Sequence, residues 1–325
     1  MKRLHQILLA ILVVQLAVSA FVFWPRTGAI EAAEPVFPDI AADDIVALTI
    51  VDDQANEVAL RKVDGAWVLP NAGNYPADET KITPLLEKLA ALETDTVVTR
   101  TDASHKQLQV AEDDFLRRID FETASGDVHT IYLGKAPRYT AAHMRVGGQS
   151  ETYLTTDLAT WEFNTSANNW IESSYTSIDQ ETLETVTLEN ANGTFTFVKD
   201  GDNWVLTDLE EDEEMAPGEA DSIVRNASTM RILRPLGKEE EEAYGLDEPA
   251  AVVTLETADG GVHVIKAGAQ DPEDNGYVVK YSDSPYYVRV QEYSVQAMVE
   301  NTREDFLTEP ATPEADEGES DTTTP

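Results

Sequence analysis

Two histidines and two tryptophans are the residues whose chemistry stands out, because each pair recurs at nearly the same spacing. His129 and His263 are 134 positions apart, and Trp67 and Trp204 are 137 apart. An imidazole can act as a general base or a metal ligand, and an exposed indole can stack on a sugar or a peptide. A metal site needs further ligands, and no HExxH-like cluster is present. Matching positions in both halves therefore favour structural roles: a core tryptophan and a histidine at a sheet surface.

The acidic segments have no spacing that indicates a site. Glu210–Glu214 and Glu239–Glu242 are interpreted as solvated loops, and Asp271–Gly276 resembles a calcium-binding loop only loosely. The sequence contains no nucleophile elbow, dinucleotide-binding motif or phosphate-binding loop, and it has no cysteine. We therefore assign no catalytic, cofactor-binding or metal-binding residue from the sequence.

An internal repeat accounts for these matched residues. LRKVDGAWVL (60–69) matches FVKDGDNWVL (197–206), and FETASGDVHTIYLG (121–134) matches LETADGGVHVIKAG (255–268). IVALTI (45–50) likewise matches LETVTL (183–188). The 134-residue spacing of the histidine blocks also matches Tyr153-Leu154 with Tyr287-Val288. Because the blocks occur in one order, we predict two tandem modules, at residues 38–176 and 177–308.

Each module is expected to be α+β, with a mostly antiparallel sheet and one main packed helix. Apolar alternation and turn residues predict successive hairpins rather than alternating βαβ units. In the first module Asp78 can cap a helix. This helix carries an apolar stripe at helical spacing, formed by Ile82, Leu85, Leu86, Leu89 and Leu92. A weaker stripe in the second module contains Ile223, Ala227 and Met230.

The N-terminal segment has the pattern of a membrane anchor. Lys2 and Arg3 precede an apolar run over 7–24, and eighteen helical residues cover ~27 Å, close to one hydrocarbon core. The basic start predicts an N-terminus in the cytoplasm and a chain that is otherwise outside, on the cytoplasmic membrane. The competing interpretation is a signal peptide cleaved after Val18-Ser19-Ala20. The apolar run continues past that point, so we favour an anchor at 1–26.

The remaining segments complete the predicted organisation. Residues 27–37 are interpreted as a spacer, and residues 309–325, rich in Pro, Thr and acid, as a disordered acidic tail. The 325-residue chain has a net charge of −38, which disfavours nucleic acid as a partner because phosphate backbones are repelled.

Several of these features together resemble a known bacterial family. They are the basic-then-apolar start, FPDIAADDIVALTI, the two tryptophan strands, PADETKITPLLEKLAALE and AYGLDEPAAVVTLE. The combination resembles the domain-of-unknown-function 4340 family over most of residues 38–308. The first module departs at QLQVAEDD (107–114), where the pattern of 244–249 has decayed. The resemblance implies a membrane-anchored protein, often encoded beside ABC-2 type transporter components related to gliding-motility export systems.

Three functional hypotheses follow. The first is a non-enzymatic, membrane-anchored, extracytoplasmic accessory protein that docks with an ABC-type transporter or envelope assembly. The second is an envelope glycan- or peptide-binding module, with a cleft between the modules lined by Tyr277, Tyr281, Tyr286 and Tyr287. The third is a hydrolase, which requires convergent polar groups that the sequence does not reveal.

Overall fold

The computed structural model describes residues 34–94 and 97–308, together with His5 and Gln15. The predicted anchor at 1–26, most of the spacer and the tail at 309–325 therefore lie outside the described residues, apart from those two positions. Within the described part of the chain, no helix has the length and apolar character needed to cross a bilayer.

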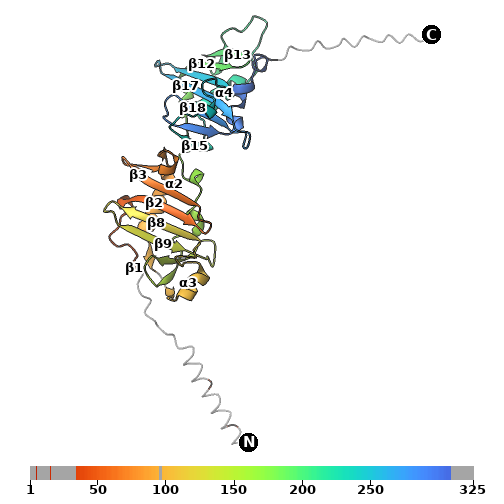
Figure 1. Cartoon of the computed structure of the whole chain (residues 1–325). Coiled ribbons are helices and arrows are strands. Elements are labelled where there is room, and N and C mark those ends of the chain that lie inside the picture. Colours follow the sequence, from red (N-terminus) through yellow and green to blue (C-terminus); the bar gives the residue numbers. More distant parts are fainter. Residues whose placement is uncertain (1–4, 6–14, 16–33, 95–96, 309–325) are drawn as a thin grey trace, which may run out of the picture.

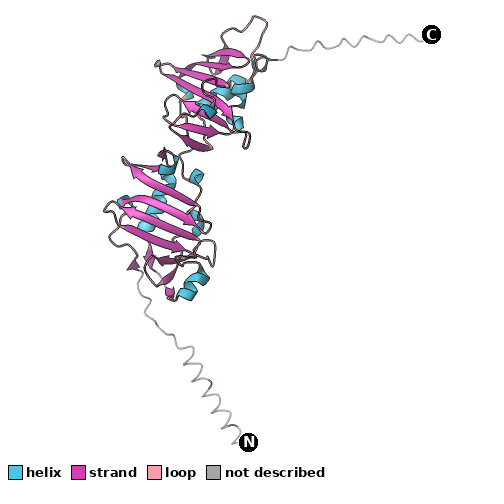
Figure 2. Cartoon of the chain, in the orientation of Figure 1, coloured by secondary structure: helices cyan, strands magenta, loops and turns pink. Residues whose placement is uncertain are grey.

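The first module is built on a nine-stranded antiparallel sheet (Figure 2). In spatial order its strands are β5 (Tyr75–Pro76), β4 (Ala66–Leu69), β3 (Glu57–Val63), β2 (Ile45–Asp52), β8 (Arg117–Thr123), β9 (Val128–Leu133), β10 (Ala142–Val146), β11 (Thr152–Thr155) and β7 (Val97–Thr99). A separate strand pair joins β1 (Glu34–Pro35) to β6 (Glu93–Thr94). Because β1 belongs to this module, the last residues of the expected spacer are part of the folded domain.

The second module repeats this order in an eight-stranded sheet. Its strands are β14 (Asn203–Leu206), β13 (Gly193–Asp200), β12 (Leu183–Asn190), β16 (Ala251–Thr257), β17 (Val262–Gln270), β18 (Tyr277–Tyr281), β19 (Tyr287–Val290) and β15 (Arg234–Gly237). Apart from β5, each strand has a counterpart at the same place in the first sheet. The α+β class and the tandem duplication are confirmed.

The main helix of each module forms where its apolar stripe predicts. The backbone N–H of Thr80 donates to the Asp78 carboxylate at the start of α2 (Glu79–Ala90), and the whole predicted stripe is buried. In the second module α4 (Glu219–Ser228) buries Ile223 and Ala227, whereas the predicted Met230 is buried just beyond the end of the helix. The other α-helices described are α3 (Asp102–Leu108) and α5 (Gln296–Glu300). Short 3₁₀ turns are η1 (Ala42–Asp44), η2 (Pro70–Ala72), η3 (Thr160–Glu162), η4 (Ala167–Asn169), η5 (Gln180–Thr182), η6 (Glu242–Tyr244), η7 (Glu292–Ser294) and η8 (Glu304–Phe306).

The loop whose sequence pattern decays in module one keeps the backbone geometry of module two. Gln109 has φ 56° and Gly245 has φ 64°, both in the left-handed region. A Cβ on Gly134 would lie 2.0 Å from the Leu108 carbonyl oxygen, and one on Gly268 would lie 2.1 Å from that of Tyr244. The two strands thus pass equally close to equivalent loops, and glycine is required at both crossings.

The last hairpin corrects the predicted alignment of the repeat. Met144 pairs with Leu133 and Tyr153, whereas Val279 pairs with Ala267 and Val288. Since Leu133 and Ala267 are 134 apart, Tyr153 corresponds to Val288 and not to Tyr287. The predicted pairing was wrong by one residue, which in a strand exchanges the two faces of the sheet.

The two modules share an apolar junction. The Glu172 N–H donates to the Pro76 carbonyl in module one, and the Ser173 carbonyl accepts from the Ile232 N–H in module two. The chain therefore passes from module one to module two slightly before the expected boundary at 176/177. Tyr75 and Tyr286 meet edge to face across the junction, with ring centroids 4.9 Å apart. One continuous cluster of buried side chains includes members of both modules, and β15 lies at this junction (Figure 1).

Candidate functional site

Both tryptophans singled out by the repeat are core residues. Trp67 in β4 is 4% exposed and Trp204 in β14 is 8% exposed. The structural interpretation is confirmed for these residues, and neither indole offers a stacking surface to a ligand.

The four tyrosines expected to line a cleft are also buried. Tyr277, Tyr281, Tyr286 and Tyr287 are each 8% exposed. The Tyr286 hydroxyl donates to the Asn74 carbonyl across the module junction, and the Tyr287 hydroxyl donates to Glu240 at 2.9 Å. The cleft that the sequence suggested for a glycan or peptide therefore loses its proposed lining.

The matched histidines, by contrast, lie in equivalent pockets of the two modules. His129 on β9 pairs with Phe121, and His263 on β17 pairs with Leu255. The hairpin turn preceding each histidine is anchored by one backbone hydrogen bond, from Ala124 N–H to Asp44 O (2.8 Å) or from Ala258 N–H to Thr182 O (2.9 Å). The shared fold thus creates the same concave position twice.

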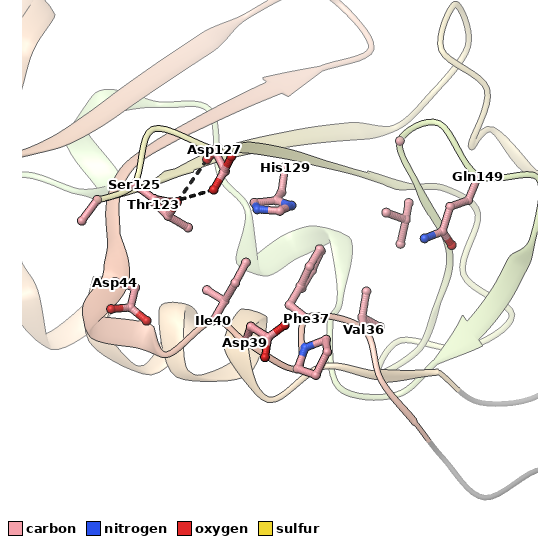
Figure 3. Close-up of a pocket in the computed structure, with 14 residues that line it drawn as sticks. Val36, Phe37, Asp39, Ile40, Asp44, Thr123, Ser125, Asp127, His129 and Gln149 are labelled. Carbon is pink, nitrogen blue, oxygen red and sulfur yellow. Dashed lines mark hydrogen bonds between the residues drawn. The ribbon is translucent and has the colours of Figure 1, made fainter.

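The first of these, which we call pocket one, has a volume of about 640 Å³. It is bounded by segment 36–44, hairpin turn 123–129 and segment 146–149, and Figure 3 shows His129 directed from its strand toward Phe37. The imidazole stacks on Phe121 with ring centroids 5.1 Å apart, and it meets Phe37 edge to face at 5.2 Å. Phe37 and His129 line the pocket and give it an aromatic wall, while Phe121 is buried against the imidazole.

Three carboxylates surround the aromatic wall of pocket one. Asp44 accepts from the Ala41 N–H at 2.9 Å, and Asp127 accepts from the Ser125 hydroxyl at 2.7 Å. Asp39 has no hydrogen-bond or ion-pair partner among residues 34–94 and 97–308. All three aspartates are exposed, so the rim of the pocket carries negative charge that a cation would satisfy.

Pocket two is the counterpart in the second module, with a volume of about 770 Å³. It is bounded by segment 177–182, turn 257–263, Tyr281 and Asp283. His263 Nδ1 lies 2.7 Å from Asp283 Oδ2, and the Tyr281 hydroxyl lies 3.1 Å from the same nitrogen. The Tyr281 hydroxyl also donates to Asp283 Oδ2 at 2.9 Å.

The protonation states in pocket two follow from these contacts. The hydrogen bond from Ser282, followed by those from Tyr281 and His263, lowers the pKa of Asp283. Burial raises the pKa of the Tyr281 hydroxyl. The carboxylate is therefore charged and the phenol neutral at neutral pH.

This group does not have the geometry of a catalytic triad. In a triad the carboxylate and the nucleophile face opposite nitrogens of the imidazole, whereas Asp283 and Tyr281 both approach Nδ1 of His263. The Ser282 hydroxyl donates to Asp283 at 2.7 Å instead of facing the ring. The arrangement is a hydrogen-bond network in which the imidazole, the phenol and the carboxylate bond to one another at one side of the pocket.

Two carboxylates of the acidic loop at 271–276 form ion pairs with one arginine. Arg289 is buried, and its Nη1 lies 2.6 Å from Asp271 Oδ2 and 3.3 Å from Asp274 Oδ1. A backbone hydrogen bond from Glu273 and the Arg289 charge lower the pKa of Asp271. Among the described residues, no three or more His, Cys, Asp or Glu side chains are grouped to hold a metal.

Sequence reasoning missed an exposed aromatic pair. Tyr139 is 74% exposed and Trp161 is 54% exposed, and their rings stack at 5.5 Å with an interplanar angle of 9°. A shallow groove of about 310 Å³ beside Trp161 is lined by Lys81 and Lys88. An aromatic residue set among polar loop residues, as in Thr160-Trp161-Glu162, is the signal that could have identified it.

Comparison with known proteins gives one match. A family model described as "Domain of unknown function (DUF4340)" matches residues 67–249. No curated protein and no solved structure matches the chain.

Proposed function

This chain belongs to the DUF4340 family, and from that premise we propose that it is a membrane-anchored extracytoplasmic accessory protein without enzymatic activity. It stands on the outer face of the cytoplasmic membrane, where it docks with an integral membrane partner. We take that partner to be an ABC-2 type permease complex, as the family resemblance implies.

The observation that carries this proposal is the position of pocket one along the chain. Val36 and Phe37 line the pocket, and the apolar run of the predicted anchor ends at Trp24, twelve residues before Val36. A fully extended chain spans at most about 3.5 Å per residue, so an anchored protein keeps pocket one within ~40 Å of the membrane. The β1 strand that precedes it lies at the end of module one away from module two (Figure 1).

The chemistry of both pockets supports binding rather than turnover. Pocket one combines aromatic rings with an exposed acidic rim, and in pocket two the imidazole already bonds to a carboxylate and a phenol of its own module. Acyl or glycosyl transfer requires a nucleophile, a base and an orienting group, each within hydrogen-bond reach of the next. Neither pocket has such an arrangement. A docking role needs only the shape and charge that pocket one provides.

The proposal is tested by crosslinking in intact membranes. The full chain and a variant lacking residues 38–308 are crosslinked, purified and analysed by mass spectrometry. We expect permease peptides with the full chain and none with the variant, and loss of transport in cells that carry only the variant. Repeated isolation of the full chain without any integral membrane protein would contradict the docking role.

The anchor has a separate test. The intact mass of the mature protein should correspond to a chain that retains residues 7–24. A mass corresponding to a chain that begins at Phe21 would show cleavage after Val18-Ser19-Ala20, and the tether on which the position of pocket one depends would be lost.

A second candidate function, glycan binding, is favoured by one observation. The stacked pair of Tyr139 and Trp161 is exposed beside a groove lined by Lys81 and Lys88, and flat aromatic faces suit sugar rings. Binding of envelope glycan fragments to the full chain, abolished by Trp161→Ala but not by Tyr293→Ala at another exposed ring, would support it. Equal binding by both variants would count against it.

A further inference from the structure

We propose that pocket one binds the phenolic side chain of a tyrosine presented by another polypeptide segment. The duplicated module supplies the template. Val146 pairs with Ile131 and Tyr281 pairs with Ile265, and Ile131 and Ile265 are equivalent in the repeat. Tyr281 therefore occupies in module two the position that Val146 occupies in module one.

The same register shows what else pocket one lacks. The Gly147 N–H donates to Thr130 and the Ser282 N–H donates to Val264, so the residues that follow, Gly148 and Asp283, are also equivalent. Module two thus places a phenol and a carboxylate beside its histidine. Module one has a smaller valine and a glycine there, so among the described residues nothing bonds to the imidazole, and a ligand can take the position of the phenol.

His129 is prepared for such a ligand. Phe121 and Phe37 hold its ring from two sides, while neither ring nitrogen has a hydrogen-bond partner in residues 34–94 and 97–308. In module two the Tyr281 hydroxyl oxygen lies 3.1 Å from Nδ1 of the equivalent imidazole. A phenol entering pocket one can make the same contact, with its ring against the aromatic wall.

The charge around pocket one selects the segment that carries the phenol. Asp39, Asp44 and Asp127 line the pocket and are exposed. A lysine or arginine next to the incoming tyrosine would lie near these carboxylates, and opposite charges favour encounter and orientation. The cavity of about 640 Å³ is within the ~300–1,000 Å³ typical of ligand sites. The occupant is therefore a peptide segment with a tyrosine beside a basic residue.

Only the source of this segment rests on the proposed function, in which it belongs to an extracytoplasmic loop of the membrane partner. The ligand chemistry of pocket one can be tested without the partner, so failure of one claim is distinguishable from failure of the other.

The experiment uses the full chain in detergent micelles with ¹³Cε1-labelled histidine. The chain has five histidines, and His129→Gln identifies the His129 resonance by its loss. The probe is N-acetyl-tyrosinamide, and the control ligand is N-acetyl-phenylalaninamide, which lacks only the hydroxyl. We expect a saturable shift of the His129 resonance with a Kd on the order of 1 mM. The control ligand should bind about fivefold more weakly, the effect of one hydrogen bond.

Val146→Tyr provides the matched variant, because it places in module one the residue of module two. We expect this variant to lose the response to the probe. Equal binding of the two ligands to the unmodified chain, or equal shifts of His129 and His263, would overturn the proposal even if Val146→Tyr failed to fold. An unchanged probe response in a folded Val146→Tyr variant would also overturn it.

Discussion

The two histidine pockets share a backbone and differ in what lies beside the imidazole. In module two His263, Tyr281 and Asp283 bond to one another, and the ring of Tyr281 is buried. In module one the same positions hold His129, Val146 and Gly148, and neither imidazole nitrogen has a hydrogen-bond partner among the described residues. Both modules keep a cavity beside the histidine, of about 640 Å³ in module one and about 770 Å³ in module two. The two copies therefore differ in whether the imidazole is bonded within its own module.

The largest expected effect comes from removing the buried tyrosine beside His263 in pocket two. Tyr281→Ala should lower the free energy of unfolding by about 3 kcal/mol, because a buried aromatic ring is lost. The matched change Val146→Ala removes two methyl groups and should cost about 1.5 kcal/mol. Urea unfolding of the full chain followed by tryptophan fluorescence measures both. Equal losses would break the distinction between the buried tyrosine of pocket two and the smaller valine of pocket one.

A smaller effect is expected at the first turn of each module, where Asp52 corresponds to Asn190. Burial acts to raise the pKa of Asp52, but hydrogen bonds from Asn56 and Thr165 outweigh it and lower the pKa to about 2. A depressed carboxyl pKa stabilises the fold above the unfolded value near 4, and this stabilisation is lost as the pH falls toward 2.

Asp52→Asn makes this turn more like that of module two and should cost about 1 kcal/mol at pH 7. The deficit relative to the unmodified chain should disappear between pH 4 and pH 2. The exposed neighbour Asp53 provides the control, since Asp53→Asn should leave stability unchanged. A deficit that persists at pH 2 would mean that the carboxylate charge is not responsible.

The smallest effect is expected in the loop with the decayed pattern. Gln109 has the left-handed conformation that Gly245 adopts in module two, so Gln109→Gly should relieve strain and raise stability by about 0.5 kcal/mol. Gly245→Ala should do the opposite, and its Cβ would lie 3.2 Å from the Ala269 nitrogen. Thermal unfolding compares the two, and destabilisation by Gln109→Gly would show that the loops are not equivalent.

The sequence predicts much of each module because the residues that determine its main helix and hairpins lie close together in the chain. Asp78 caps α2 as expected, and the apolar alternation gives the central hairpins of both sheets, β2–β3 and β8–β9 in one and β12–β13 and β16–β17 in the other. The edge strands β7 and β15 escaped prediction, since each is short and is defined by pairing with a distant strand.

The pockets could not be derived from the sequence for a different reason. Pocket one joins segments around Phe37, His129 and Val146, which only the tertiary fold brings together. The one-residue error in the last hairpin also concealed that Val146 corresponds to Tyr281. The matching positions of the two histidines correctly indicated that the shared fold determines where they lie. They could not show that the fold forms a pocket around each histidine.

Site-specific photocrosslinking tests the central claim most directly. Gln149 in pocket one and Asp259 in pocket two are both exposed, and each is replaced in turn by p-benzoylphenylalanine in the full chain in living cells. We predict an adduct with an integral membrane protein from position 149 and none from position 259. Equal adducts from both positions, or an adduct from position 259 alone, would contradict a membrane partner docked at pocket one.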